Sequence, residues 1–194
     1  FAEFEENNLP AVMFGAGDEP FLYKKIFHAF EKSVDAGIMD VFVFTNGALL
    51  DEKKSKLLMK SGVTRVFVSI DAATEEAYDL VRVEKHGKKS SQGNRLEKLD
   101  KNIIDLVELR SEMKSLLPII RVSFAVQEEN IKDVAPFKDK WEGTVDYIEF
   151  QSCSDCAGVS DTARLTENER WKRNDKDDTF KCTAPWNTVT VWAN

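Results

Sequence analysis

Short apolar runs in this chain are followed, one after another, by residues that form hydrogen bonds or carry charge. Gly17-Asp18-Glu19-Pro20 follows the run at 11–14, and Thr45-Asn46-Gly47 follows the run at 41–44. The later runs end in the same way, with Ser69 and Asp71, with Gln127 and Asn130, and with Gln151 and Cys153. Carboxylates, hydroxyls and amides of this kind can hold a polar ligand. Buried strands that deliver such groups at their carboxyl ends are typical of the active-site rim of a β/α barrel.

Segments with helical periodicity separate the apolar runs. In the segment 21–35, Ile26, Phe30 and Val34 recur at the spacing of one helix face. Four further helices are predicted, at 51–61, 74–83, 96–113 and 131–141. Asp51 is the expected N-cap of the first of these, and Thr74 opens the N-terminal turn of the next. Strands and helices therefore alternate, which predicts an α/β fold of parallel strands joined by right-handed helical crossovers.

Alternation within three of the runs places polar side chains on one face and apolar side chains on the other. The polar faces carry Arg65, Phe67, Ser69 and Asp71; Arg121, Ser123, Ala125 and Gln127; and Tyr147, Glu149 and Gln151. A strand in a doubly wound sheet is apolar on both faces. We therefore expect these faces to line a wide, ligand-filled barrel interior, and the alternative is a set of edge strands with one solvated face.

Three of these motifs resemble, in order and spacing, the motifs of radical S-adenosylmethionine (radical SAM) enzymes. Gly17-Asp18-Glu19-Pro20 is similar to the Gly-x-Glu-Pro motif after the second barrel strand of that family, and Thr45-Asn46-Gly47 to the Thr-Asn-Gly segment after the third. Ser69-Ile70-Asp71, followed by Tyr78 and Arg82, is similar to the pattern after the fourth. The branch that the chain resembles has a cysteine-rich carboxyl-terminal extension, the SPASM group. The resemblance implies a partial (β/α)6 TIM-like barrel whose first βα unit is missing.

The resemblance also implies S-adenosylmethionine as the cofactor, held at the carboxyl edge of the strands. The implied cofactor-binding residues are Gly17, Asp18, Glu19, Pro20, Thr45, Asn46, Ser69, Asp71, Arg121 and Ser123. Of the hydroxyls and short polar groups, Thr45 and Ser69 are the favoured contacts. Arg121 pairs either with the cofactor carboxylate or with Glu149 or Asp71, and Asn46 and Asp71 serve either as ligands or as caps and turn residues.

The family is defined by a Cys-x3-Cys-x2-Cys loop that holds a [4Fe–4S] cluster, and this sequence contains no such loop. Because both ends read as interrupted, we expect a fragment: residues 1–151 form the partial barrel, and 152–194 form a linker and the beginning of a SPASM domain. Cys182, in Cys182-Thr183-Ala184-Pro185-Trp186, is similar to the first cysteine of that domain. It is an expected ligand of an auxiliary [4Fe–4S] cluster, with Cys153 and Cys156 as further candidates. The alternatives are a buried free Cys182 and a Cys-x2-Cys pair without a special role.

By resemblance, the intact protein cleaves S-adenosylmethionine reductively at a [4Fe–4S] cluster and abstracts hydrogen from a substrate, for which a peptide or protein is the candidate. Flavodoxin or ferredoxin is the implied electron donor, and the fragment itself is expected to be inactive. Two other functions stay open. One is an aldolase-like β/α-barrel enzyme, against which the lack of a candidate Schiff-base lysine at a strand end counts. The other is a thiolate metal-binding module built from the three cysteines.

Composition excludes several classes of partner. The chain carries 27 Lys and Arg against 34 Asp and Glu, a net charge of −7, and this balance argues against a nucleic-acid or membrane surface. No apolar stretch approaches the length of a membrane span. The absence of a signal-peptide pattern favours a cytoplasmic protein.

Overall fold

Five parallel strands form one sheet in the part of the chain that a computed structural model describes, residues 6, 9–15, 17–82 and 94–152. The strands are β1 (Ala11–Phe14), β2 (Asp40–Thr45), β3 (Arg65–Ser69), β4 (Ile119–Val126) and β5 (Tyr147–Ser152). Their order in the sheet is their order in the chain, and every neighbouring pair is parallel. A doubly wound sheet reverses its strand order part-way, whereas this succession is that of a β/α barrel. The predicted α/β fold is confirmed.

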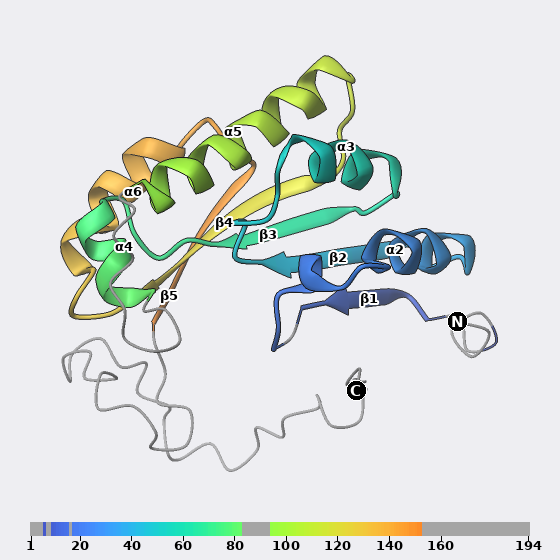
Figure 1. Cartoon of the computed structure of the whole chain (residues 1–194), viewed down its shortest axis with the longest axis horizontal. Helices are drawn as coiled ribbons and strands as arrows, with labels where there is room; N and C mark the ends of the chain where they lie inside the picture. Colours follow the sequence, from blue (N-terminus) through green and yellow to red (C-terminus); the bar gives the residue numbers. More distant parts are fainter. Residues whose placement is uncertain (1–5, 7–8, 16, 83–93, 153–194) are drawn as a thin grey trace, which may run out of the picture.

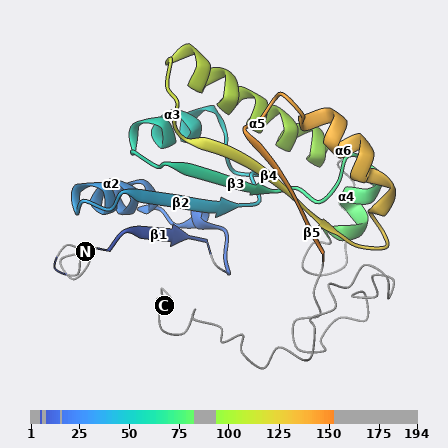
Figure 2. The same ribbon diagram turned by 180° about the vertical axis from the view of Figure 1, so that it is seen from behind.

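Helices connect the strands and cover one face of the sheet (Figures 1 and 2). They are η1 (Pro20–Leu22), α2 (Ile26–Asp35), α3 (Glu52–Lys60), α4 (Glu75–Val81), α5 (Arg95–Glu112), η2 (Ile131–Asp133) and α6 (Val134–Trp141). Among the described residues, none of these helices is long and apolar enough to cross a lipid bilayer.

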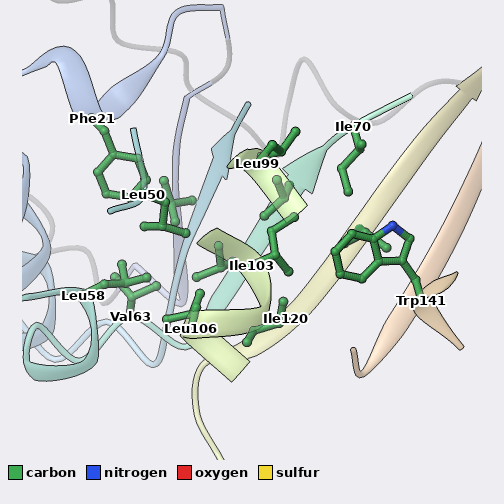
Figure 3. Close-up of a cluster of buried hydrophobic side chains, with 14 of the residues drawn as sticks. Phe21, Leu50, Leu58, Val63, Ile70, Leu99, Ile103, Leu106, Ile120 and Trp141 are labelled. Carbon is green, nitrogen blue, oxygen red and sulfur yellow. The ribbon is translucent and has the colours of Figure 1, made fainter. Parts of the chain in front are cut away.

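The hydrophobic core lies between the sheet and this helical layer. Alternate strand residues such as Val43, Val66 and Val122 are fully buried and meet Ile103 and Leu106 of α5 in one cluster. Figure 3 shows side chains from both layers in one cluster, with Leu106 of α5 next to Ile120 of β4. Burial of each such side chain contributes about 1.5–3 kcal/mol to the free energy of folding. The core therefore determines which face of each strand packs against the helices, and it leaves the opposite face of the sheet uncovered by them.

Two of the predicted helices are interrupted near their starts. The segment 21–35 begins as the short 3-10 helix η1, and Tyr23 then adopts an extended backbone (φ −76°, ψ 118°) before α2 starts. The segment 131–141 is divided into η2 and α6. The N-caps are as predicted: the Asp51 carboxylate accepts a hydrogen bond from the Lys54 amide at 2.8 Å, and the Thr74 hydroxyl accepts one from the Ala77 amide at 3.3 Å.

The face of the sheet opposite the helices is partly aromatic. Phe42, Phe44 and Phe67 form a cluster, with ring centroids 5.7 Å apart for Phe42 and Phe67 and 4.8 Å apart for Phe44 and Phe67. The guanidinium groups of Arg65 and Arg121 lie over these rings, 5.0 Å from the Phe42 centroid and 3.6 Å from the Phe67 centroid. The polar interior predicted from three strands is therefore confined to the β3–β5 side, because β2 contributes phenylalanines to this face.

Gly15 is required by the tight passage from β1 into the next loop. Its φ is +97°, and a Cβ atom there would overlap the carbonyl oxygen of Phe44. We predict that Gly15→Ala lowers the free energy of unfolding by about 3 kcal/mol or more, measured by urea denaturation. Gly37→Ala is the matched control, because Gly37 also has a positive φ (+79°) but open space around it. It should cost only about 1–2 kcal/mol, and equal losses would contradict the steric argument.

Asp146 ties the start of β5 to β4 and α5. It accepts a hydrogen bond from the Ile120 amide at 2.7 Å and forms an ion pair with Arg110. Partial burial alone would raise the pKa of Asp146, but the hydrogen bonds from Arg110 and Ile120 outweigh it and hold the pKa below its ordinary value. A carboxyl group with a lowered folded-state pKa stabilises the fold above its unfolded pKa, and this contribution is lost as the pH falls through the folded pKa.

We therefore predict that Asp146→Asn lowers the free energy of unfolding by about 1 kcal/mol at pH 7. The difference from wild type should shrink as the pH falls below about 4, measured by urea denaturation across that range. Asp35→Asn is the control, because the Asp35–Lys32 pair is exposed and should contribute little. A difference that does not change with pH would show that the lowered pKa plays no part.

Candidate functional site

Glu19 joins the loop after β1 to the end of β2. One carboxylate oxygen, Oε1, accepts hydrogen bonds from the Thr45 hydroxyl at 2.8 Å and the Phe21 amide at 3.3 Å. The other, Oε2, accepts one from the Asn46 amide at 2.8 Å. Glu19 therefore places a carboxylate with three donors at the carboxyl edge of the sheet, and these bonds fix the two loops relative to each other.

The Thr45-Asn46-Gly47 segment is bonded within itself. The Thr45 hydroxyl, which donates to Glu19, accepts from the Gly47 amide at 2.9 Å, and the Asn46 side chain accepts from the Ala48 amide at 2.9 Å. Thr45 is only 5% exposed. At Gly47 (φ +71°) an added Cβ would overlap Leu99 and lie 2.8 Å from Val68 Cγ1, so the turn packs directly on the core. The buried Thr45 side chain thus holds the turn after β2 in place through its bonds to Glu19 and Gly47.

A second polar cluster lies where β3 ends. Nη2 of Arg82, at the C-cap of α4, donates to the Ser69 hydroxyl at 2.6 Å and the Ser69 carbonyl at 3.1 Å, and it forms an ion pair with Asp71. The Ser69 hydroxyl in turn donates to Asp71 at 3.3 Å. The Arg82 side chain is 31% exposed, and among the described residues nothing accepts a hydrogen bond from its Nη1. Arg82 therefore has a donor left for a ligand at this edge.

Arg121 and Ser123 lie on the open face, further toward the amino ends of the strands than Asp71. Arg121 pairs with Glu149 of β5 at 2.8 Å, and its guanidinium stacks on Phe67. This is one of the two alternatives left open by the sequence. Arg121 Nε is buried and makes no hydrogen bond within the described residues, whereas the buried Glu149 Oε2 has the ion pair with Arg121 Nη1 as its partner there. The Ser123 hydroxyl, on the same face, has no partner there either, and it stands opposite both Ser69 and Glu149 in the strand register.

The predicted site residues therefore fall into separate groups. Glu19, Thr45 and Asn46 form one cluster, Ser69 and Asp71 another, and Arg121 and Ser123 a third on the open face. Gly17 and Asp18 are exposed in the loop before η1, and Pro20 is buried at its start. Cys153, Cys156 and Cys182 lie outside the described residues. Within residues 6, 9–15, 17–82 and 94–152, no group of three His, Cys, Asp or Glu side chains could hold a metal ion.

The contacts of Arg82 were not predicted from the sequence. Its place in the Tyr-x3-Arg spacing after Ser69-Ile70-Asp71 was the available signal, but an arginine on a helix is more often solvated or structural. The structure brings it onto Ser69 and Asp71. Tyr78, on the same helix, is buried, and burial raises the pKa of its hydroxyl even though Arg82 and Arg95 act in the opposite direction. The phenol therefore stays neutral beside this cluster.

Glu19→Gln tests the clamp between the first two loops. Glutamine retains one acceptor for the Thr45 hydroxyl, but its amide group would face the Asn46 N–H, donor against donor. We predict a loss of about 1–3 kcal/mol in the free energy of unfolding, measured by urea denaturation. The control Asp18→Asn changes a neighbouring exposed carboxylate and should leave stability unchanged within about 0.5 kcal/mol. Equal effects of the two substitutions would show that Glu19 is not a structural clamp.

Several known proteins are similar to this chain in sequence or in fold. The probable GTP 3′,8-cyclase of Methanocaldococcus jannaschii is 31% identical over 119 residues, which are 61% of this chain and 35% of that protein. The crystal structure of Streptococcus suis SuiB superposes with a TM-score of 0.61 at 15% identity, covering 83% of this chain and 33% of SuiB. SuiB bound to the precursor peptide SuiA gives a TM-score of 0.60 at 16% identity, with 81% and 32% covered.

A structure of SuiB bound to S-adenosylmethionine is similar to the same degree, with a TM-score of 0.61 at 15% identity over 83% of this chain and 34% of that one. At these identities the solved structures show a shared fold. The chain spans about a third of the length of the proteins it matches. The family model of the radical SAM superfamily matches residues 1–133 of the chain. The chain belongs to the radical SAM superfamily.

Proposed function

We propose that this chain is the cofactor-positioning part of a radical SAM enzyme, with S-adenosylmethionine bound across the carboxyl edge of β1–β4. The observation that carries the proposal is the presence of groups of opposite charge along one edge of the sheet, Glu19 after β1 and Arg82 beyond β3. The methionine part of S-adenosylmethionine carries an ammonium and a carboxylate group. The carboxylate after β1 and the guanidinium beyond β3, with β2 between these strands, provide a charge of opposite sign for each.

The described side chains fit that cofactor. Arg82 binds the cofactor carboxylate through its remaining donor, and Ser69 orients the guanidinium. Gly17 and Pro20 shape the turn that approaches the amino end, and Glu19 supplies the charge behind it. Asp18, Asn46 and Ser123 are further proposed contacts, with Thr45 and Asp71 supporting the rim from within. Arg121 is proposed as part of the floor, because its guanidinium is occupied by Phe67 and Glu149.

The described residues do not fit an iron–sulfur cluster, since they contain no cysteine and no alternative metal-ligand group. Their role is therefore to hold S-adenosylmethionine, to orient it and to exclude water from it. In the intact enzyme a [4Fe–4S] cluster would supply the electron for reductive cleavage of the cofactor. An auxiliary [4Fe–4S] cluster on Cys182, with Cys153 and Cys156, remains a proposal about residues beyond the described ones.

A peptide or protein is the proposed substrate. The fold is shared with SuiB, a structure of which is bound to its precursor peptide, and this supports the proposal. The open face of β3–β5 is the proposed place for the substrate, because the helices cover the other face. The electron donor is proposed to be a flavodoxin or ferredoxin. Membership of the radical SAM superfamily favours this function over an aldolase-like barrel.

Titration calorimetry of the full chain with S-adenosylmethionine tests the assignment of Arg82. We predict that Arg82→Lys weakens binding about tenfold, because lysine cannot reach Ser69, Asp71 and a ligand carboxylate together. Arg65→Lys is the matched control: Arg65 is also paired with an aspartate, Asp40, but it lies at the amino end of β3. It should leave affinity unchanged.

Arg121→Lys distinguishes the two arginines in the same experiment. A loss of affinity in Arg121→Lys with no loss in Arg82→Lys would indicate that the cofactor carboxylate binds to Arg121 and not to Arg82. No binding to the wild-type chain at about 1 mM, where even a weak complex of about −4 kcal/mol is half formed, would contradict the proposed edge site.

A further inference from the structure

Side chains replace backbone hydrogen bonds where β4 continues beyond the end of β3. The Ile70 amide still donates to the Ser123 carbonyl of β4, at 3.1 Å. One residue later the Asp71 carboxylate takes over, and its Oδ1 accepts a hydrogen bond from the Ala125 amide at 2.7 Å. The carbonyl groups of Asp71 and Ala125 are both bonded by the side chain of Asn130. The end of the sheet is thus closed by Asp71 and Asn130.

Asn130 is buried and fully engaged. It is 1% exposed, and its Nδ2 donates to the Asp71 carbonyl at 2.8 Å and to the Ala125 carbonyl at 2.9 Å. Its Oδ1 accepts from the Gln127 amide at 2.7 Å. A short side chain with two donors and one acceptor is required for these three bonds, and asparagine alone provides it.

These bonds determine the conformation of Asp71. Its φ is +67°, in the left-handed region that a residue with a side chain avoids by about 1–2 kcal/mol. With its carbonyl held by Asn130 and Oδ1 held by Ala125, the remaining oxygen, Oδ2, is directed at Arg82 and Ser69. Release of the carbonyl would let the backbone return to the extended region and would turn the carboxylate away.

The same short segment also fixes the start of the helix that carries Arg82. Asp133 Oδ2 accepts hydrogen bonds from the amides of Ala73 and Thr74, both at 2.7 Å, and from the Thr74 hydroxyl at 2.9 Å. Thr74 is the N-cap of α4, and Arg82 is its C-cap. The segment after β4 therefore holds α4 at its start and holds Asp71, the partner of Arg82.

We propose that Asn130 is a positioning residue for the cofactor carboxylate: it acts through Asp71 to orient the guanidinium of Arg82. The inference rests on the proposed function, in which Arg82 binds that carboxylate. Asn130 itself touches neither Arg82 nor a ligand. Its contribution is to keep Asp71 in the conformation that anchors Nη2 and leaves Nη1 without a partner among the described residues.

A double-mutant cycle on the full chain tests the proposal. Asn130→Ala removes all three bonds, and Asn130→Asp keeps the volume and the acceptor but loses both donors. Each should weaken binding of S-adenosylmethionine about tenfold in wild type, and by about twofold or less in the Arg82→Lys background, because a residue that acts through Arg82 has no further effect once Arg82 is gone. Equal weakening in both backgrounds would overturn the proposal.

The second readout needs no ligand. In ¹H–¹⁵N spectra the Arg82 Nε–H signal should shift and exchange faster with water in both Asn130 variants. Asn102→Ala is the matched control, because Asn102 is also a buried asparagine with a bond to a backbone carbonyl, that of Gly47, and its loss should leave the Arg82 signal in place. An unchanged Arg82 signal in the Asn130 variants would overturn the proposal. Where these variants do not fold, Asp71→Asn tests the same connection at its middle residue with the same expected result.

The outcomes separate the two proposals. Movement of the Arg82 signal together with unchanged affinity in Arg82→Lys would support the positioning role and contradict the cofactor role of Arg82. Loss of affinity in Arg82→Lys with no effect of either Asn130 variant would contradict the positioning role alone.

Discussion

Backbone groups at the end of a parallel strand lose the partners that the sheet provides, and they must find others if they are buried. In this chain the partners come from side chains at the carboxyl edge. The Glu19 carboxylate accepts a hydrogen bond from the Asn46 amide, and the Asp71 carboxylate accepts one from the Ala125 amide. The Asn130 side chain donates to the carbonyls of Asp71 and Ala125. The shape of the edge depends on these bonds, since each joins the end of one strand to its neighbour. In the proposed cofactor site, an edge held by these bonds would already be ordered before the ligand binds, which would lower the entropy cost of binding.

One consequence is that several residues with suitable chemistry for a ligand serve the framework. The Thr45 hydroxyl uses both its donor and an acceptor within the protein, and both oxygens of Asp71 are occupied. The groups left for a ligand among the described residues include a donor on Arg82, the Ser123 hydroxyl, the Asn46 side-chain NH2 group and the exposed Asp18. In the proposed site, these free groups would be oriented by the occupied ones.

The sequence was sufficient to predict the strands, the connecting helices and the face of β3, β4 and β5 that turns away from them. Those features follow from local periodicity, and caps such as Asp51 and Thr74 are equally local. The clusters at the edge are different, because Asn130 bonds to a residue 59 positions away and Glu19 to one 26 positions away. No spacing rule predicts such contacts. The break at Tyr23 was also hidden, since Phe21 and Ile26 fit one continuous helix face.

Two arginines on one side of the sheet illustrate why residue type alone does not decide between candidate partners for the cofactor carboxylate. Arg121 lies over Phe67 and pairs with Glu149, and its buried Nε makes no hydrogen bond within the described residues. A second carboxylate at Arg121 would have to displace Glu149, at the cost of leaving that charge in a partly buried place. Arg82 is also paired, with Asp71, but it is anchored through one nitrogen only, and its side chain is 31% exposed against 20% for Arg121. The two arginines differ in their position along the strands. Arg121 lies on the open face, before the carboxyl ends of the strands, whereas Arg82 lies at the carboxyl edge, where the proposed ligand can reach it.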